Sequence, residues 1–312
     1  MIFNILGAGA IGSFLASKLE EIGHTVNLIS IHRSKAEIEL IQKTGIKCFY
    51  IGNNSQNKAD YIFYNVISIN NVLPQSDYMI ICLKAQQLED TLSKITANCK
   101  YIMSIMNGYG YFHILDEFRG NIPLIIASTR LGVTNVPINK ILQLGNGVTY
   151  IADYIYNADT SISIAYKSTN IFNEAKIKSS YKESYKDILL KKLLINSVIN
   201  PITAIWNIDN GEILANTERI NLVNNLTKEA IEVLVKEGIH WTYEEAMDLI
   251  RKIADSTSKN TSSMRQDILS GRETELDYIN GALVNLARKH NIKLPVNEEI
   301  IYRIKTLSNN LA

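Results

Sequence analysis

The sequence predicts an α/β protein with two domains: a doubly wound, mostly parallel sheet over residues 1–180, followed by an all-helical domain over residues 181–312. Over the first 150 residues, short β-branched runs alternate with helical patterns, which is typical of parallel strands joined by right-handed crossovers. After about residue 180 the strand pattern disappears and only long helical periodicities follow. A chain of 312 residues is also long enough for two domains of ordinary size.

Apolar runs place the individual elements. We expect strands at 2–6, 26–30, 78–83, 101–106 and 124–128, with helices at 10–21, 34–43, 86–97 and 110–118. Residues 141–153 predict a terminal antiparallel hairpin that turns at Gly145–Gly147. In the second domain, apolar periodicity predicts helices at 183–200, 217–237, 243–256 and 276–290, and one more after Pro295.

Composition and charge argue against several classes of function. Hydrophobic residues make up 46% of the chain and the formal net charge is +1, so no overall field favours nucleic acid or an anionic membrane. The longest apolar runs are too short to cross a bilayer, and the N-terminus lacks the basic region of a signal peptide. Cys48, Cys82 and Cys99 are odd in number and widely spaced. We therefore expect a reduced, cytoplasmic protein without a structural metal.

A glycine-rich turn follows the first predicted strand. Residues 7–12 read Gly7-Ala8-Gly9-Ala10-Ile11-Gly12, a G-x-G-x-x-G between a strand and a helix. In such a turn the first glycine permits the tight bend, the second lets the backbone approach a pyrophosphate, and the third lets helix and strand pack closely. Unpaired amides and the helix dipole then face the phosphates. This context predicts dinucleotide binding, although a merely structural glycine turn is the alternative.

The residues after the second predicted strand bear on the choice of cofactor. An NAD enzyme usually has Asp or Glu there to hold the ribose 2′-hydroxyl. Residues 30–35 instead read Ser-Ile-His-Arg-Ser-Lys, with no acid and two cations. Arg33 could bind a 2′-phosphate through a charge-assisted fork, which favours NADP(H). The alternative is that Arg33 and Lys35 belong to an ordinary solvated loop.

Two later loops share the same edge of the predicted sheet. Lys84 follows the run YMIICL, and Asn107-Gly108 follows YIMSIM. Ligands bind outside the carboxyl ends of strands in open α/β sheets, so both positions are candidates for ligand contact. The plainer interpretations are a surface charge for the lysine and a simple turn for Asn-Gly.

A line of polar residues runs along an otherwise apolar helix in the second domain. In KKLLINSVINP (191–201), Lys192, Asn196 and Asn200 recur every fourth residue and form a nearly straight stripe, and Pro201 predicts an end or a kink. An unpaired buried amide costs about 1–3 kcal/mol, so these groups are paired or line a cavity. The stripe suits a 2-keto acid, with Lys192 as general acid. Alternatively, the lysine reaches solvent and the asparagines bond to loop backbone.

Three polar residues further along are additional candidates. They are Asn210, Ser263 and Glu275. Ser263 could bind a carboxylate, or it could only cap a helix. Glu275 precedes an apolar-periodic helix, where an acid is often no more than a favourable dipole contact.

Taken together, these motifs resemble the ketopantoate reductase (2-dehydropantoate 2-reductase) family along nearly the whole chain. The resemblance is carried by ILGAGAIGS (5–13), the lysine of CLKAQQLEDTL (82–92), MNGYG (106–110), KLLINSVINPITAIWNIDNGEIL (192–214) and SSMRQDILSGRETELDYINGALV (262–284). The two long stretches are highly specific, and their order and spacing fit the family. The resemblance implies a Rossmann-type domain followed by a helical domain similar to the C-terminal domain of 6-phosphogluconate dehydrogenase.

The resemblance also implies roles for individual residues. Lys192 matches the general acid that protonates the keto oxygen, and Glu275 matches an acid that anchors the substrate, partners the lysine and contacts the cofactor. The residues implied to hold the substrate are Asn107, Asn196, Asn200, Asn210 and Ser263. Those expected to contact the cofactor are the turn 7–12, Arg33, Lys84 and Asn107.

The expected activity is NADPH-dependent reduction of ketopantoate to pantoate, a step in pantothenate and coenzyme A biosynthesis. This makes the protein an NADP-dependent oxidoreductase acting on CH–OH groups, with a small 2-keto acid as its partner and a homodimer as one possible assembly. Two alternatives stay open: a reductase of another branched 2-keto acid on the same fold, or a non-catalytic NADP-sensing regulator. The regulator predicts a decayed polar stripe, whereas the stripe residues of this chain are retained together with Ser263 and Glu275.

Overall fold

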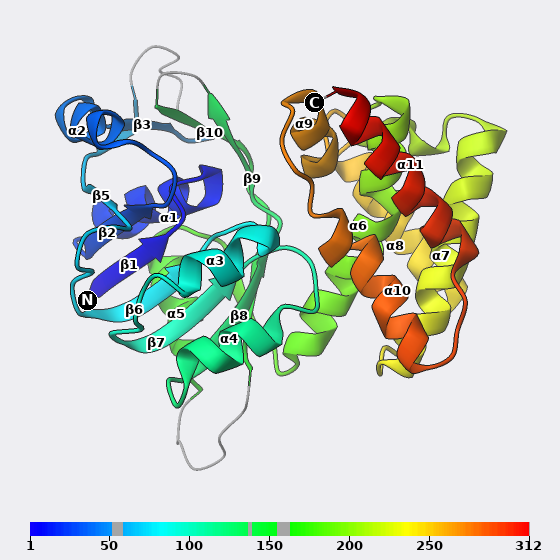
Figure 1. The fold of residues 1–312 in the computed structure, drawn as a ribbon, viewed down its shortest axis with the longest axis horizontal. Helices are drawn as coiled ribbons and strands as arrows, with labels where there is room; N and C mark the ends of the chain where they lie inside the picture. The colour runs from blue at the N-terminus through cyan, green and yellow to red at the C-terminus, as the bar shows by residue number, and fades with distance from the viewer. Residues whose placement is uncertain (52–58, 137–138, 155–162, 312) are drawn as a thin grey trace. The chain divides into compact units, whose positions relative to one another are not determined.

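The computed structural model describes residues 1–312 except 52–58, 137–138, 155–162 and 312 (Figure 1). The chain divides into an α/β unit, residues 1–106 and 112–188, and a helical unit, residues 107–111 and 189–312. The division falls after Ile188 rather than after residue 180, and the short loop 107–111 belongs to the helical unit. The loop 107–111 is attached to the helical unit by a backbone hydrogen bond of 2.8 Å from Tyr109 N–H to Tyr278 O.

An eight-stranded sheet forms the centre of the α/β unit. Its spatial order is β12 (Ser179–Tyr181), β11 (Thr149–Asp153), β8 (Leu124–Thr129), β7 (Cys99–Ile105), β6 (Ser76–Ile81), β1 (Ile2–Leu6), β2 (Thr25–Ser30) and β5 (Val66–Ser68). Neighbouring strands from β8 to β5 are parallel, and β11 runs antiparallel to β8. The strand order reverses between β1 and β6, which is where ligands bind in open α/β sheets.

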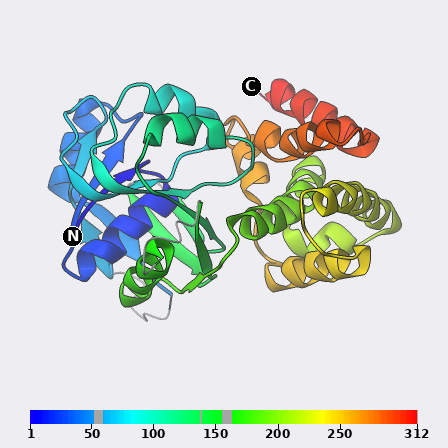
Figure 2. The same ribbon diagram turned by 90° about the horizontal axis from the view of Figure 1, so that it is seen from below.

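Helices cover both faces of this sheet. They are α1 (Ala10–Glu21), α2 (Lys35–Thr44), α3 (Leu88–Leu92), α4 (Phe112–Arg119) and α5 (Ile164–Glu174), with a 3-10 turn η1 (Ala85–Gln87) before α3. Figure 2 shows α1 and α5 on one face and α3 and α4 on the other. The predicted doubly wound fold is confirmed, although the helix expected over 86–97 is only the short pair η1 and α3.

A second sheet of four strands was not predicted. Its order is β4 (Tyr61–Phe63), β3 (Ile46–Phe49), β10 (Lys140–Gly145) and β9 (Gly132–Val136), and α1 packs against both sheets. The predicted hairpin over 141–153 is wrong, because β10 pairs with β9 and β3 while β11 pairs with β8 and β12. Gly147 lies between them, and a Cβ there would be 2.0 Å from the carbonyl oxygen of Arg130. The glycine therefore allows the chain to pass from one sheet to the other.

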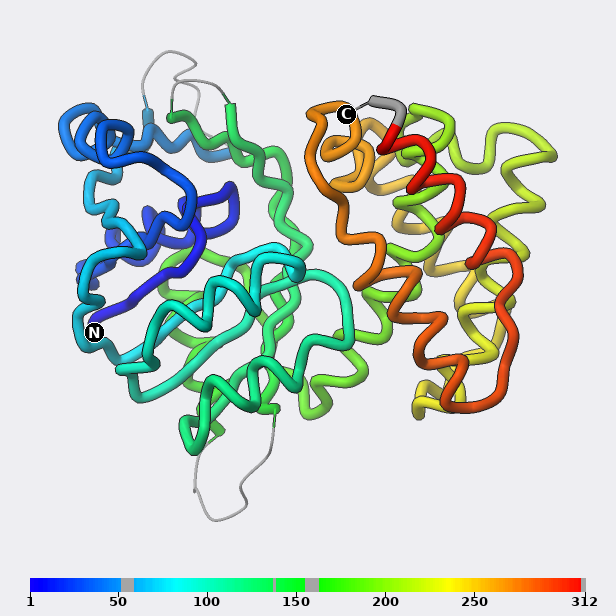
Figure 3. The backbone as a smooth tube through the Cα atoms, in the orientation of Figure 1, coloured from blue at the N-terminus to red at the C-terminus, as the bar shows by residue number. Residues whose placement is uncertain are grey.

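Helices of 7 to 22 residues build the helical unit, and Figure 3 traces the chain through them. They are α6 (Tyr185–Trp206), α7 (Thr217–Lys236), α8 (Tyr243–Ser256), α9 (Ser263–Leu269), α10 (Asn280–Lys289) and α11 (Pro295–Leu311), with 3-10 turns η2 (Asn210–Leu214) and η3 (Leu276–Tyr278). By length and hydropathy alone α6 could cross a membrane, but 78% of its apolar window is buried within the protein. Leu194, Val198 and Ile202 of α6 are fully buried in the core of this unit. The helix is thus a core helix, as its composition predicts.

Helix α6 continues past Pro201 to Trp206. A proline removes the backbone hydrogen bond to the carbonyl four residues earlier, which is that of Ser197. The side chain of Asn280 replaces this donor, because its Nδ2 lies 2.9 Å from Ser197 O. Pro201 was predicted to end or to kink the helix, and the prediction of a helix end is therefore wrong.

Candidate functional site

The glycine turn 7–12 lies at the carboxyl end of β1, beside the switch point of the sheet. Gly7 has φ +113°, and an added Cβ would lie 2.5 Å from Cys82 O. A Cβ at Gly12 would lie 2.0 Å from Gly7 O. At Gly9, by contrast, a Cβ would meet no atom of the described residues within 4 Å. The fold itself therefore requires Gly7 and Gly12, whereas Gly9 leaves open space at the turn.

The N-terminus of α1 fits a dinucleotide. Gly9 is its N-cap without a side-chain hydrogen bond, and the first turn of the helix contains no acidic residue. The first amides of a helix have no intrahelical acceptor, and the helix dipole favours an anion there. Open space beside Gly9 and available amides are the two features that a pyrophosphate needs.

The segments after three neighbouring strands are hydrogen-bonded to the adjacent strand or loop. Gly7 N–H donates to Ile29 O at 2.9 Å, and Cys82 N–H donates to Leu6 O at 2.8 Å. Further out, Gln87 Nε2 and His32 Nε2 are 2.9 Å apart. Lys84 is the N-cap of η1, so it lies on the same edge of the sheet as the glycine turn.

Arg33 lines a pocket of about 290 Å³ in the α/β unit. Its described lining residues include Lys140 and contain no acid. The Arg33 Nη1 donates to Asn139 Oδ1 at 3.0 Å, which holds the side chain toward the turn between β9 and β10. Desolvation lowers the pKa of Arg33, and Glu37 nearby partly opposes this effect. Lys35, in contrast, is the first residue of α2 rather than a loop residue, and its side chain is 91% exposed.

The polar stripe of α6 contains a buried side chain without a partner. Asn200 is 6% exposed, and its Nδ2 donates to no atom of the described residues. Lys192 and Asn196 are half-buried. Buried amides in native proteins are nearly always hydrogen-bonded, to protein or to water, and an unpaired one costs about 1–3 kcal/mol. The Nδ2 of Asn200 therefore makes no hydrogen bond to loop backbone among the described residues, and this donor is available to a ligand.

Asn210 also has an unpaired buried atom, but this atom is an acceptor whereas that of Asn200 is a donor. Its Nδ2 donates to Thr257 Oγ1 at 3.0 Å, whereas its Oδ1 is buried without a donor among the described residues. The backbone of η2 is fixed as well, because Asn210 N–H donates to Asn260 O at 3.1 Å. Among the described residues, the helical unit thus holds an unpaired amide donor on Asn200 and unpaired amide acceptors on Asn210 and Asn280.

Glu275 and Asn107, which are distant in sequence, are brought together. Glu275 is 5% exposed and accepts a hydrogen bond from Asn107 Nδ2 at 3.2 Å. Gly108 has φ +83°, and a Cβ there would lie 2.8 Å from the Cβ and the carbonyl oxygen of Tyr278. Asn107 and Gly108 therefore form a turn, as the plainer interpretation predicts, and the turn also places the Asn107 side chain against the carboxylate of Glu275.

Ser263 is exposed at the first residue of α9 and is not its cap. The cap is Ser262, whose Oγ accepts from Arg265 N–H at 3.2 Å and from Thr203 Oγ1 at 2.7 Å. Thr203 belongs to α6, so this contact fixes the start of α9 beside the polar-stripe helix. Arg265 also pairs with Asp209 just before η2. Sequence reasoning missed these supporting residues, although two adjacent serines before a helix are a recognisable capping signal.

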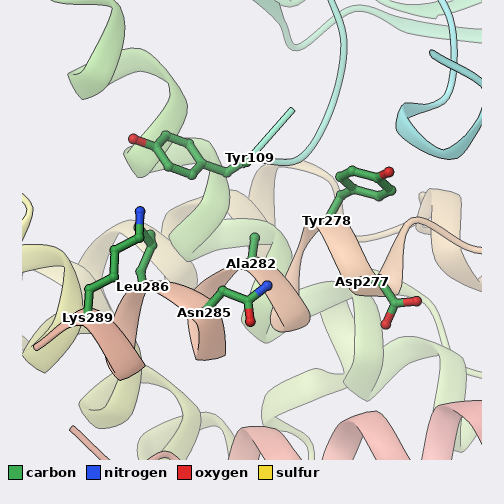
Figure 4. Close-up of a pocket in the computed structure, with 8 residues that line it drawn as sticks. Tyr109, Asp277, Tyr278, Ala282, Asn285, Leu286 and Lys289 are labelled. Atoms are coloured by element: carbon green, nitrogen blue, oxygen red, sulfur yellow. The ribbon is translucent and has the colours of Figure 1, made fainter. Parts of the chain in front are cut away.

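A separate pocket of about 210 Å³ lies in the helical unit (Figure 4). Its described lining residues are Tyr109, Gly110, Asp277, Tyr278, Ala282, Asn285, Leu286 and Lys289. None of these is a predicted site residue. Tyr109 and Tyr278 do belong to the segments that carry Asn107 and Glu275, so the pocket adjoins those segments.

The doubly wound unit with its glycine turn and the helical unit with its polar stripe define a class, the nicotinamide-nucleotide oxidoreductases of two-domain type. Family models agree and are more specific. "Ketopantoate reductase PanE/ApbA" matches residues 3–155, and "Ketopantoate reductase PanE/ApbA C terminal" matches residues 184–308. The chain belongs to the ketopantoate reductase family.

Individual relatives extend over nearly the full length of the chain. The 2-dehydropantoate 2-reductase of Shigella flexneri is 30% identical, with 98% of this chain and 94% of the relative covered. The structure of D-mandelate dehydrogenase with NADH and anilino(oxo)acetate has a TM-score of 0.89 at 22% identity, covering 100% of this chain and 99% of that one. A dimeric ketopantoate reductase from Staphylococcus aureus has a TM-score of 0.79 at 20% identity, with 100% of both chains covered. These structural likenesses establish the fold.

Proposed function

We propose that the protein reduces ketopantoate to pantoate with NADPH. The observation that carries the proposal is Asn200, a buried amide with an available donor on the helix that also carries Lys192, in a chain of the ketopantoate reductase family. A 2-keto acid offers acceptors to such a donor through its carboxylate and keto oxygens. The hydroxyl of ketopantoate can in turn donate to the available oxygen of Asn210.

The chemistry assigns a task to each polar residue. The bound nicotinamide nucleotide supplies the hydride. Lys192 donates a proton to the keto oxygen while that oxygen gains negative charge. Glu275 anchors the substrate and acts with the lysine, and its carboxylate is oriented by Asn107. Asn196 and Ser263 complete the substrate contacts, and Lys84 serves the cofactor from the edge of the sheet that also bears the glycine turn.

The direct test is NADPH oxidation by the purified protein in the presence of ketopantoate. We expect steady turnover that depends on both compounds. A protein that leaves ketopantoate untouched but reduces another branched 2-keto acid would disprove the substrate assignment while leaving the chemistry intact. No turnover of any 2-keto acid would favour the regulator.

The preference for NADPH rests on Arg33 and Lys140, which supply two cations to a pocket whose described lining contains no acid. We expect Arg33→Ala to raise KM for NADPH by about tenfold or more, since a hydrogen bond to a charged group contributes about 1.5–3 kcal/mol. KM for NADH should change little, because NADH has no 2′-phosphate. Lys35→Ala is the matched control, since its side chain is 91% exposed. Equal losses with both nucleotides would contradict this role for Arg33.

Asn200→Ala tests the available donor. We expect KM for ketopantoate to rise by roughly tenfold, because one hydrogen bond to a charged acceptor is lost. The unfolding temperature should change little, because the Nδ2 has no partner within the described protein to lose. A large drop in unfolding temperature with an unchanged KM would show that the amide serves the fold instead.

The remaining parts of the proposal follow from the family. A cytoplasmic location and a role in pantothenate and coenzyme A biosynthesis fit a reductase of this substrate. A homodimer is supported by the dimeric relative from Staphylococcus aureus. Sedimentation of the purified protein measures the assembly directly.

A further inference from the structure

A chain of buried polar groups crosses the helical unit. Asn280 and Asn297 are both 0% exposed. The Asn280 Nδ2 donates to Ser197 O at 2.9 Å and to Asn297 Oδ1 at 2.9 Å. The Asn297 Nδ2 in turn donates to Glu229 Oε2 at 2.8 Å. We call these four residues, which belong to α6, α10, α11 and α7, the asparagine relay.

The carboxylate of Glu229 sets the direction of every hydrogen bond in the relay. It accepts from the backbone N–H groups of Val296 and Asn297, at 2.8 and 2.9 Å, in the first turn of α11. An ionised carboxylate can only accept, so the Asn297 amide group must point its nitrogen toward Glu229 and its oxygen toward Asn280. Asn280 therefore presents its nitrogen, and both of its N–H groups are used.

The relay ends at the backbone oxygen that Pro201 leaves without a donor. In an uninterrupted helix the amide of residue 201 would donate to Ser197 O, and proline has no such amide. A buried carbonyl without a donor is unfavourable, and Asn280 supplies the missing one. The turn that is completed in this way runs from Ser197 to Pro201 and carries Asn200.

The same side chain is tied to the segment that carries Glu275. Only η3 (Leu276–Tyr278) and Ile279 separate Glu275 from Asn280. Within η3 the Tyr278 N–H donates to Glu275 O at 3.1 Å, so the segment is compact. Asn280 thus joins the backbone of the polar-stripe helix to the segment of the buried carboxylate.

We propose that Asn280 is a positioning residue for the reaction. Through the Ser197 carbonyl it fixes the distance between the polar stripe of α6 and Glu275. The inference rests on the proposed function, because it takes Lys192, Asn200 and Glu275 as the reacting and binding groups. Asn280 itself acts only through these groups.

The first test is Asn280→Ala in the full-length protein. We expect KM for ketopantoate to rise and kcat to fall, each by about tenfold, since displacements near 1 Å can cost about 10²-fold in rate. The dissociation constant for NADPH should change by a smaller factor than KM for ketopantoate, because the glycine turn lies in the α/β unit and only Glu275 would be displaced. The control is Asn285→Ala on the exposed face of the same helix, which should leave all three constants unchanged.

A second substitution separates positioning from general loss of packing. In Pro201→Ala the new backbone N–H can donate to Ser197 O, which makes that carbonyl independent of Asn280. Asn280→Ala should therefore raise KM by a smaller factor in the Pro201→Ala background than in the wild type, and the two substitutions should be non-additive in unfolding free energy. Equal factors in both backgrounds would overturn the proposal, as would Asn280→Ala with wild-type KM and kcat.

Failure of the function and failure of the inference give different results. If the wild-type protein does not reduce ketopantoate, the proposed function fails. KM and kcat of Asn280→Ala are then measured with whichever keto acid the wild-type protein reduces. If the wild-type protein reduces no keto acid at all, the positioning role is overturned as well. If the wild-type protein is active and Asn280→Ala lowers the unfolding temperature without changing KM or kcat, only the positioning role fails.

Discussion

Lys192→Ala is expected to lower kcat for keto-acid reduction by about 10²-fold or more, the usual loss when a general acid is removed. The ammonium group is the proton donor that the alkoxide needs as it forms, and alanine leaves solvent as the only donor. NADPH binding should be unchanged, because the glycine turn belongs to the other unit. Steady-state kinetics together with a fluorescence titration of NADPH measure both quantities.

The neighbouring lysine provides a matched control. The Lys191 Nζ lies 4.9 Å from the centre of the Trp241 ring, so this lysine makes a cation–π contact. Lys191→Ala should lose about 0.5–1 kcal/mol of stability and keep its kcat. Added methylamine should partly restore turnover in Lys192→Ala but not change the Lys191 variant. Full activity in Lys192→Ala would disprove the acid role. Equal losses of kcat in both variants would show that the reaction needs positive charge on this helix but no particular lysine.

The sequence was sufficient for two helices, α1 and α8, whose ends are set by local patterns. The bounds of α1 agree with the prediction, because the glycine turn and the apolar periodicity both depend on neighbouring residues. The bounds of α8 also agree, and its start is fixed by a capping box between Thr242 and Glu245. The four-stranded sheet was missed because its central strands, β3 and β10, are far apart in sequence. Pairing between such segments depends on tertiary contacts that periodicity does not contain.

The candidate site shows the same limit. Spacing alone identified the stripe of α6, since positions four apart share a helix face. It could not show that the Nδ2 of Asn200 has no acceptor among the described residues, whereas the Nδ2 of Asn280, which no pattern singled out, donates two hydrogen bonds and only its Oδ1 is unpaired. The difference between a ligand-binding amide and a structural one lies in partners that come from other helices. The same holds for Ser262, which takes the capping role that the sequence offered to Ser263.

Two glycine substitutions in the cofactor turn are expected to have opposite effects on stability, although both weaken cofactor binding. Gly12→Ala would place a Cβ 2.0 Å from the backbone oxygen of Gly7, so α1 must move away from β1. Overpacking of this kind costs about 1–3 kcal/mol, and we expect a lower unfolding temperature together with weak cofactor binding. Thermal unfolding followed by circular dichroism measures the first effect without any ligand.

Gly9→Ala should fold normally and still bind the cofactor more weakly. Gly9 has φ −82° and ψ −169°, which any residue adopts, and its Cβ would meet no described protein atom within 4 Å. Replacing glycine where alanine fits even stabilises a protein by about 0.4–1 kcal/mol. The new methyl group would instead occupy the space that a pyrophosphate needs at the N-terminus of α1, so the dissociation constant for NADPH should rise by at least about tenfold, or about 1.4 kcal/mol. Wild-type affinity in Gly9→Ala would mean that the phosphates do not approach this turn, whatever its glycines contribute to the fold.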